Sequence, residues 1–520
     1  MKLQLARNAF ANLLGAAVPA AVALATVPLI VHGLGDAGYG VYALITAIVG
    51  YFAIIDINVT AGSVKHIAAH WAEGVHDQDE VKAAHHHGPP GANDGIGQTI
   101  TFGLLVYIAL GLAGGIAVEA CAPWLVRDVF SVPVALRDAA TAALQLAAVG
   151  FLIGQLQSYL DSVPQSLMRY DRSARLNVLF GSVVPIATVL VLMLGGDLYH
   201  VILLRVIASA AHCVLLWRTI RRLLPALRLQ WPARKLQRSL LHFSAYACLS
   251  RFAAMSYAYA DKLMIGALVG VAGLAVYAVA ATLANRLLGL TGRLASVLFP
   301  AASALAASDE LPRLGKVYLK ASRYMTFING AMLLLIAVFA EPILRYWMSP
   351  DFAHRGATVL AVMALSQFID ALTSLPSLVN DGMGHPAVSG SFALGRALLG
   401  LATVYAGVTL DGIDGAAWGH LAASMLMTTI FLRYVHGRTV PVALADVARY
   451  AYLPGALGLA GIGSAALLAH AAAGQSGAAF AGVGLATAIA LAMYGAFFIA
   501  APGDRQRLWS LWQAWPARGA

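Results

Sequence analysis

Cationic side chains stand inside two strongly apolar segments between positions 251 and 300. Arg251, Lys262, Arg286 and Arg293 occur in a stretch hydrophobic enough to cross a membrane twice. A charge at bilayer depth costs at least about 2.5–3.5 kcal/mol, so it usually faces a polar interior or a partner. The four side chains are therefore candidates for binding an anionic group, such as a pyrophosphate, within the membrane.

The spacing of these cations places them in two stripes. Arg251 and Lys262 are eleven residues apart and Arg286 and Arg293 are seven apart, so each pair lies within about 20° around a helix axis. Counted from the ends of their segments, Arg251 and Arg286 lie about 15–18 Å deep, near the midplane. With Lys262 nearer the outer side and Arg293 nearer the cytoplasmic side, the four would form a ladder of positive sites.

Carboxylates in the apolar segments offer a different role for the same cations. Arg286 or Arg293 could instead form an ion pair inside the helix bundle with one of three acids. These acids are Asp56, Asp261 and Asp370. Both interpretations place the charges away from lipid.

Other charges within the spans have more than one interpretation. Lys262 could pair with a neighbour or extend its amine toward the interface. Asp56 could couple an ion to transport, or it could be a hydrogen-bond partner in helix packing. For Arg205 and Arg396 we expect internal ion pairs.

The composition identifies the elements that hold these residues. The 520 residues are 60% hydrophobic and only 11% charged, and their mean hydropathy is +0.75. A soluble domain carries about 25% charged residues, so we expect an all-α polytopic membrane protein. The net charge of +10 comes from basic loops between spans, which is typical of membrane topology and not of nucleic-acid binding.

Fourteen segments are long and apolar enough to span a bilayer, which takes about 20 residues. They lie near 10–34, 39–62, 96–120, 139–163, 177–196, 198–217, 241–268, 271–300, 324–347, 357–380, 388–409, 412–433, 450–472 and 478–500. With a cytoplasmic N-terminus, 24 of the 34 Lys and Arg lie on the cytoplasmic side, 4 lie outside and 6 lie within spans. The positive-inside rule therefore predicts fourteen helices with both ends in the cytoplasm.

An internal repeat predicts two similar lobes. Residues 35–43 read GDAGYGVYA and residues 270–278 read GVAGLAVYA, with six of nine positions identical at an offset of 235. Parallel repeats of this kind relate the halves of many transporters. We expect the following parts: an N-terminal six-helix lobe (1–220), a basic cytoplasmic linker along anionic headgroups (221–240), a C-terminal six-helix lobe (241–434), and helices thirteen and fourteen with a cytoplasmic tail (435–520).

Signs of catalysis are missing from the sequence. It contains no His-Glu-x-x-His, phosphate-binding loop, Gly-x-Ser-x-Gly or Cys-x-x-Cys motif, and its loops are too short for a soluble catalytic domain. Six histidines between positions 66 and 87 could bind a metal, but a solvated loop is the preferred interpretation. We therefore expect no enzyme activity, no cofactor and no metal.

Two long stretches carry a family resemblance. Residues 28–62 read PLIVHGLGDAGYGVYALITAIVGYFAIIDINVTAG, and residues 259–305 read YADKLMIGALVGVAGLAVYAVAATLANRLLGLTGRLASVLFPAASAL. They resemble helices one and two, and seven and eight, of bacterial polysaccharide and O-antigen flippases, in the multidrug/oligosaccharidyl-lipid/polysaccharide exporter superfamily. One departure is IIDINVTAG at 54–62, where the family often has Asp-Leu-Gly.

The resemblance implies both a fold and an activity. Two six-helix lobes would enclose a cavity and carry an undecaprenyl-pyrophosphate-linked oligosaccharide to the outer leaflet of a bacterial inner membrane by alternating access. Membrane lipids and other polysaccharide assembly proteins would be the partners. The alternatives are an exporter of a drug-like solute or of the peptidoglycan lipid precursor and, more distantly, a membrane glycosyltransferase or polymerase.

Overall fold

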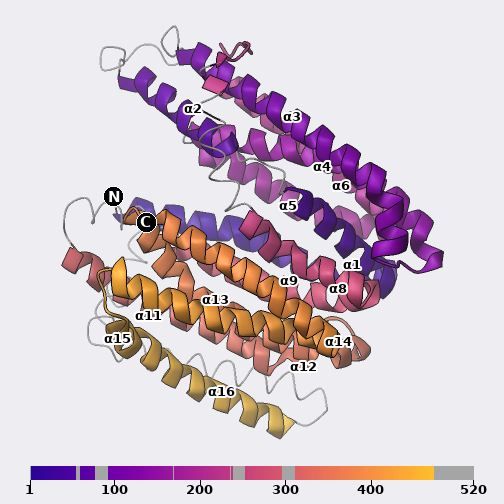
Figure 1. Ribbon diagram of the computed structural model, residues 1–520, viewed down its shortest axis with the longest axis vertical. Helices are drawn as coiled ribbons and strands as arrows, with labels where there is room; N and C mark the ends of the chain where they lie inside the picture. Colours follow the sequence, from indigo (N-terminus) through magenta and orange to yellow (C-terminus); the bar gives the residue numbers. More distant parts are fainter. Residues whose placement is uncertain are drawn as a thin grey trace, which may run out of the picture. The chain divides into compact units, whose positions relative to one another are not determined.

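The computed structural model describes residues 2–53, 59–76, 92–167, 169–234, 236–237, 240, 252–295 and 311–473. Within these ranges the regular structure is helical and includes no strand (Figure 1). Eight of the described helices are long and apolar enough to cross a membrane. The predicted all-α polytopic membrane protein is therefore confirmed, whereas the count of fourteen spans stays a prediction.

Two of the longest helices are each two helices joined by a tight turn. Helix α1 (Lys2–Phe52) changes direction at Gly35, where φ is 69°. Helix α14 (Pro386–Arg438) breaks at Asp411 and Gly412, and Gly412 has a φ of 53°. Because only glycine adopts such backbone angles without strain, the chain can reverse here within one or two residues. The sequence placed divisions between spans at both turns.

The internal repeat has the same backbone feature in both copies. The second copy begins at Gly270, between α8 (Asp261–Leu268) and α9 (Val271–Ala295). The φ angle of Gly270 is 97°, and that of Gly35 in the first copy is 69°. In both copies the repeat is therefore a glycine turn followed at once by a helix.

The chain forms two compact units. The first comprises residues 1–279 and 390–419, and the second comprises 280–389 and 420–520. This division differs from the lobes expected at 1–220 and 241–434, because helices near 252–279 and 390–419 pack with the N-terminal ones. The lobe assignment itself stays a prediction.

The first unit is built around α4 (Arg137–Ser166), which packs against both α3 (Ala92–Trp124) and α6 (Leu198–Leu223), while α5 (Tyr170–Met193) packs along α1 (Figure 1). In the interior of this unit the rings of Tyr107 and Tyr159 stack with their centres 5.1 Å apart. The Tyr159 hydroxyl donates to the Thr99 carbonyl oxygen, and the Tyr107 hydroxyl lies 2.6 Å from that of Thr60. Both buried phenols thus have the partners that burial demands.

The segment that follows the second predicted span is more helical than expected. Helix α2 (Val59–His76) continues well past the predicted span end at 62. Its Ile67 is buried with Ile96 and Ile100 of α3, so packing against a neighbouring helix sustains the helix beyond its most apolar part. His66 lies on this helix, and the histidines at 85–87 lie outside the described residues.

The basic linker is partly anchored to the first unit. Leu224 and Leu227 are buried among side chains of α3 and α6, and Arg221 donates to the Leu227 carbonyl oxygen at 2.8 Å. The Ala233 N–H donates to the side-chain oxygen of Gln98 at 3.2 Å. One side of the linker therefore packs on the helices, and its contact with lipid headgroups stays a prediction.

The second unit contains α11 (Leu311–Val338), which packs against α13 (Pro350–Gly382) and α16 (Leu453–Ala473). The span predicted at 324–347 was wrong in its bounds. Helix α11 begins at Leu311, and Phe339 separates it from the short helix α12 (Ala340–Trp347). Hydropathy missed the start because the first turns of α11 carry basic residues, although Leu314 and Tyr318 of the same turns are buried.

Helix α6 begins with a capping carboxylate that gives a testable effect. Asp197 accepts hydrogen bonds from the N–H of His200 at 3.1 Å and from its ring Nδ1 at 2.7 Å, which lower the pKa of Asp197. We expect Asp197→Ala to cost about 1 kcal/mol. A carboxylate whose pKa is lowered in the folded state stabilises the fold at pH values above its unfolded-state pKa of about 3.9. This contribution is lost as the pH falls below that value and Asp197 is protonated. The difference in free energy of unfolding between the native protein and the alanine variant should therefore shrink at acidic pH.

Thermal unfolding of purified protein, followed from neutral to acidic pH, measures this contribution. Asp197→Asn is the control, because asparagine caps a helix about as well as aspartate does. An alanine variant as stable as the native protein at neutral pH would contradict the prediction.

Candidate functional site

A buried carboxylate at the start of α8 is the centre of the candidate site. Asp261 is only 6% exposed, and its Oδ1 lies 3.3 Å from the Lys262 ammonium. It also accepts hydrogen bonds from the Lys262 backbone N–H at 2.7 Å and from the Tyr277 hydroxyl at 2.8 Å. A charge pair inside an apolar helix bundle is tolerated when it is hydrogen-bonded in this way.

The helix immediately before Asp261 has a local irregularity. Residues Ser256–Ala260 form a π-helical turn, η4, and such turns often occur at functional sites. The Lys262 ammonium donates to the Ala258 carbonyl oxygen of this turn at 2.8 Å. Of the roles considered for Lys262, the structure shows the local pair with a neighbour.

Arg396 of α14 contributes a second cation to the same unit. Its guanidinium lies 5.1 Å from the centre of the Tyr257 ring, in η4. Cation–π contacts of this kind stabilise a cation away from water. The arginine is therefore held over the π-helical turn that leads into Asp261.

Arg205 of α6 contacts helix α1. Its Nη1 donates to the Tyr42 hydroxyl at 2.7 Å and lies 3.3 Å from Oγ1 of Thr46, and the guanidinium lies 5.4 Å from the centre of the Tyr42 ring. Within the described ranges no carboxylate oxygen comes within 4.0 Å of it. The internal ion pair expected for Arg205 is thus not formed with any described residue.

Equivalent tyrosines of the repeat both contact charged side chains. Tyr42 in the first copy accepts a hydrogen bond from Arg205, and Tyr277 in the second donates one to Asp261. The sequence repeat aligned these tyrosines but did not reveal their partners. Each partner lies outside the nine repeated residues, and Arg205 is 163 residues from Tyr42.

The structure describes only some of the other predicted site residues. Arg251 and Asp56 lie outside the described residues, and the side chain of Arg293 does too. Arg286 has an exposed side chain on the part of α9 that belongs to the second unit, and Asp370 is half-buried on α13. Asp261 and Lys262 are two predicted site residues that the structure places in direct contact with each other.

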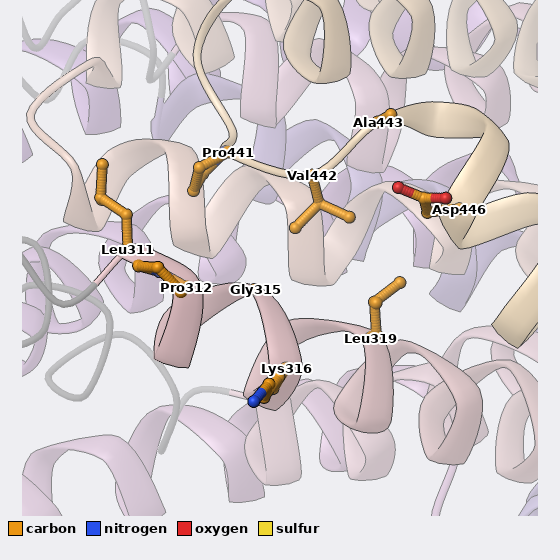
Figure 2. A pocket seen from close by; sticks show the side chains of 9 residues that line it. All are labelled: Leu311, Pro312, Gly315, Lys316, Leu319, Pro441, Val442, Ala443 and Asp446. Carbon is orange, nitrogen blue, oxygen red and sulfur yellow. The ribbon is translucent and has the colours of Figure 1, made fainter.

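An open pocket of about 380 Å³ lies in the second unit, between the start of α11 and the chain that follows α14. Figure 2 shows Lys316 and Asp446 on its rim among mostly apolar side chains. Both charged side chains are exposed, and none of the predicted site residues lines the pocket. Among the described residues no three His, Cys, Asp or Glu side chains form a group suited to a metal.

Comparison with known proteins agrees with the helical architecture. Residues 100–354 match a family described as "Polysaccharide biosynthesis protein". A curated protein of Shigella flexneri named "Putative O-antigen transporter" is 20% identical over 454 residues, which is 85% of this chain and 99% of that protein.

Two solved structures share the fold. One is the lipid II flippase MurJ in an inward closed conformation, with a TM-score of 0.70 and 12% identity over 94% of this chain and 98% of that one. The other is an inward-facing multidrug resistance MATE family transporter, with a TM-score of 0.69 and 15% identity over 81% of this chain and 94% of that one.

Helix content, apolar spans and these neighbours define a multi-pass membrane protein with the fold of the MOP transporter superfamily. The chain is similar to the polysaccharide biosynthesis family over residues 100–354 and to the curated O-antigen transporter over 85% of its length. The predicted resemblance to bacterial polysaccharide and O-antigen flippases is thereby confirmed.

Proposed function

We propose that this protein is a flippase for a lipid-linked oligosaccharide of the undecaprenyl-pyrophosphate type. It moves the lipid from the cytoplasmic to the outer leaflet of a bacterial inner membrane by alternating access, in polysaccharide or O-antigen biosynthesis. The observation that carries the proposal is the hydrogen-bonded Asp261–Lys262 pair, buried in an apolar helix of a chain with this family relationship. Buried charge inside a membrane bundle is costly and typically marks a transport pathway.

The substrate contacts in this proposal are cations. Arg251, Arg286 and Arg293 bind the diphosphate, because guanidinium groups match phosphate oxygens in bidentate fashion. The exposed Arg286 side chain is accessible to such a ligand. Lys262 is already bonded to Asp261 and Ala258, so it joins the pathway only after exchanging one of these partners.

Topology and coupling belong to the same proposal. Fourteen helices in two six-helix lobes plus a terminal pair, with both ends in the cytoplasm, agree with the distribution of Lys and Arg. Asp56 or Asp370 would couple an ion to transport or would pair with an arginine within the bundle. The protein itself would carry out no covalent chemistry.

Restoration of glycan export in a bacterial strain that lacks its own flippase tests the function. We expect the native chain to restore surface polysaccharide and Arg286→Gln and Arg251→Gln to reduce it at least about tenfold, since each loses a charged hydrogen bond. Arg286→Lys keeps the charge and is the matched control. Full export by both glutamine variants, at native abundance in the membrane, would contradict the cationic pathway.

The alternative functions have distinct outcomes in the same system. Export of a drug-like solute, or rescue of peptidoglycan lipid transport without glycan export, would favour the exporter alternatives. Elongation or transfer of glycan by the purified protein would identify an enzyme and would overturn the flippase proposal.

A further inference from the structure

Arg205 is a membrane-embedded cation whose described contacts are all uncharged. It lies on α6, an apolar helix of spanning length. Its hydrogen bonds go to the side chains of Tyr42 and Thr46, and its ring contact is with Tyr42. Because an arginine in a membrane protein costs free energy unless its charge is used or compensated, this arrangement needs a functional explanation.

The two hydroxyls lie on the accessible face of α1. Tyr42 and Thr46 are four residues apart, so they project from the same side of the helix. Both are partly exposed, whereas Val41, Leu44 and Ile45 are at most 3% exposed. Arg205 is also partly exposed, so the tip of its side chain is not sealed inside the first unit. An arginine within an apolar span usually faces a polar space or pairs with an anion.

Hydrogen bonding leaves one edge of the guanidinium available. Both hydrogen bonds of Arg205 use Nη1, so the edge formed by Nε and Nη2 makes no hydrogen bond to any described residue. A guanidinium binds carboxylate or phosphate through two parallel N–H groups. The orientation that Tyr42 and Thr46 impose thus presents a free fork for an anion.

Tyr42 supplies a further donor at the same place. The Thr46 hydroxyl donates its proton to the Tyr42 carbonyl oxygen at 2.9 Å, so Thr46 can only accept from Arg205. The Tyr42 hydroxyl accepts from Arg205 and keeps its own proton for another acceptor. An anion bound at the guanidinium fork would therefore receive two N–H groups and one O–H group.

We propose that Arg205 and Tyr42 form a binding site for the diphosphate of the translocated lipid. The site lies on helices α6 and α1 of the first unit and uses residues other than the cations between positions 251 and 300. Thr46 positions the guanidinium without contacting the ligand. This inference rests on the proposed function, which supplies a diphosphate lipid as the substrate.

Binding to the full-length protein in phosphatidylcholine nanodiscs tests the site. The probe is undecaprenyl diphosphate, and its Kd is compared with that of undecaprenyl monophosphate and of phosphatidylglycerol. We expect Arg205→Gln to weaken diphosphate binding about tenfold or more, in keeping with the loss of charge-assisted hydrogen bonds. Tyr42→Phe keeps the aromatic ring and should weaken binding by a few-fold.

Arg221→Gln is the matched control. Arg221 lies on the same helix, 5.2 Å from the centre of the Trp217 ring, and donates to a backbone carbonyl. It shares the structural roles of Arg205 without belonging to the proposed site, so its variant should bind the diphosphate as the native protein does. Arg205→Lys, which retains the charge, should keep part of the affinity if Arg205→Gln fails to fold.

The outcomes separate this site from the proposed function. The proposed site would be overturned if folded Arg205→Gln bound undecaprenyl diphosphate with the Kd of the native protein. It would also be overturned if both Arg205→Lys and Tyr42→Phe kept that native Kd. Equal losses for phosphatidylglycerol and diphosphate would also overturn it, by identifying a bulk-lipid headgroup site. If the native chain restores glycan export while these variants bind normally, only the Arg205 site fails. If the native chain neither restores export nor binds diphosphate, the proposed function fails as well.

Discussion

Valine at position 415 is expected to force apart the two halves of α14 and to lower the thermal stability of the protein severely. Gly415 and Gly407 face each other across the break in this helix, and a Cβ on either would meet the carbonyl oxygen of the other. A Cβ on Gly419 would meet the carbonyl oxygen of Thr403 in the same way. Small residues at such crossings let membrane helices approach backbone to backbone.

The expected cost lies at or above the usual range for overpacking. Adding atoms to a well-packed interior typically costs about 1–3 kcal/mol when side chains can adjust. Here the obstacle is backbone, which cannot rotate away, so the helices themselves must separate. We expect Gly415→Val to accumulate poorly in the membrane, and what is purified to unfold at a markedly lower temperature.

Gly437→Val is a matched control for this effect. Gly437 lies on the same helix, and a Cβ there would meet no atom within 4 Å. Its replacement should change stability only through helix propensity, by about 1 kcal/mol or less. Size-exclusion profiles and thermal unfolding of the solubilised variants measure both effects. If the two variants behaved alike, the close crossing within α14 would not be important for stability.

The same helix shows how far sequence reasoning reaches. One predicted span ends at 409 and the next begins at 412, beside an Asp-Gly pair of the kind that favours tight turns, and the break at Asp411 and Gly412 confirms this division. The facing of Gly407 and Gly415 was not predicted. It depends on how the two helices cross after the turn, and hydropathy carries no information about that.

The candidate site shows a similar limit. Asp261 and Lys262 were recognised because charges stand out in an apolar segment, and adjacency in sequence made a local pair plausible. The Arg205–Tyr42 contact joins residues 163 positions apart. Nothing in the local pattern of α6 identifies a tyrosine on α1 as the partner, so Arg205 was expected to pair with an acid. Long-range partners of this kind depend on the packing of helices within the unit.

Alanine at position 261 is expected to destabilise the protein by about 3–5 kcal/mol, the usual cost of removing one member of a buried ion pair. The Lys262 side chain is only 16% exposed. Without Asp261 its ammonium keeps the hydrogen bond to the Ala258 carbonyl oxygen but loses the negative charge beside it. The substitution also removes the acceptor of the Tyr277 hydroxyl, which is fully buried. Thermal or denaturant unfolding of purified protein would show the loss directly.

A second substitution distinguishes a buried charge from lost packing. The double variant Asp261→Ala with Lys262→Met no longer holds a buried ammonium without its carboxylate, so it should be more stable than Asp261→Ala alone. The effects of the two substitutions on the free energy of unfolding are not additive, because the two residues are in contact. Asp351→Ala is the exposed control. Its carboxylate lies 2.7 Å from Arg355 but is 77% exposed, and such pairs contribute about 1 kcal/mol or less. If Asp261→Ala cost no more than Asp351→Ala, the Asp261–Lys262 pair would be a surface-like contact, and the buried charge that supports a transport pathway through this helix would lose its basis.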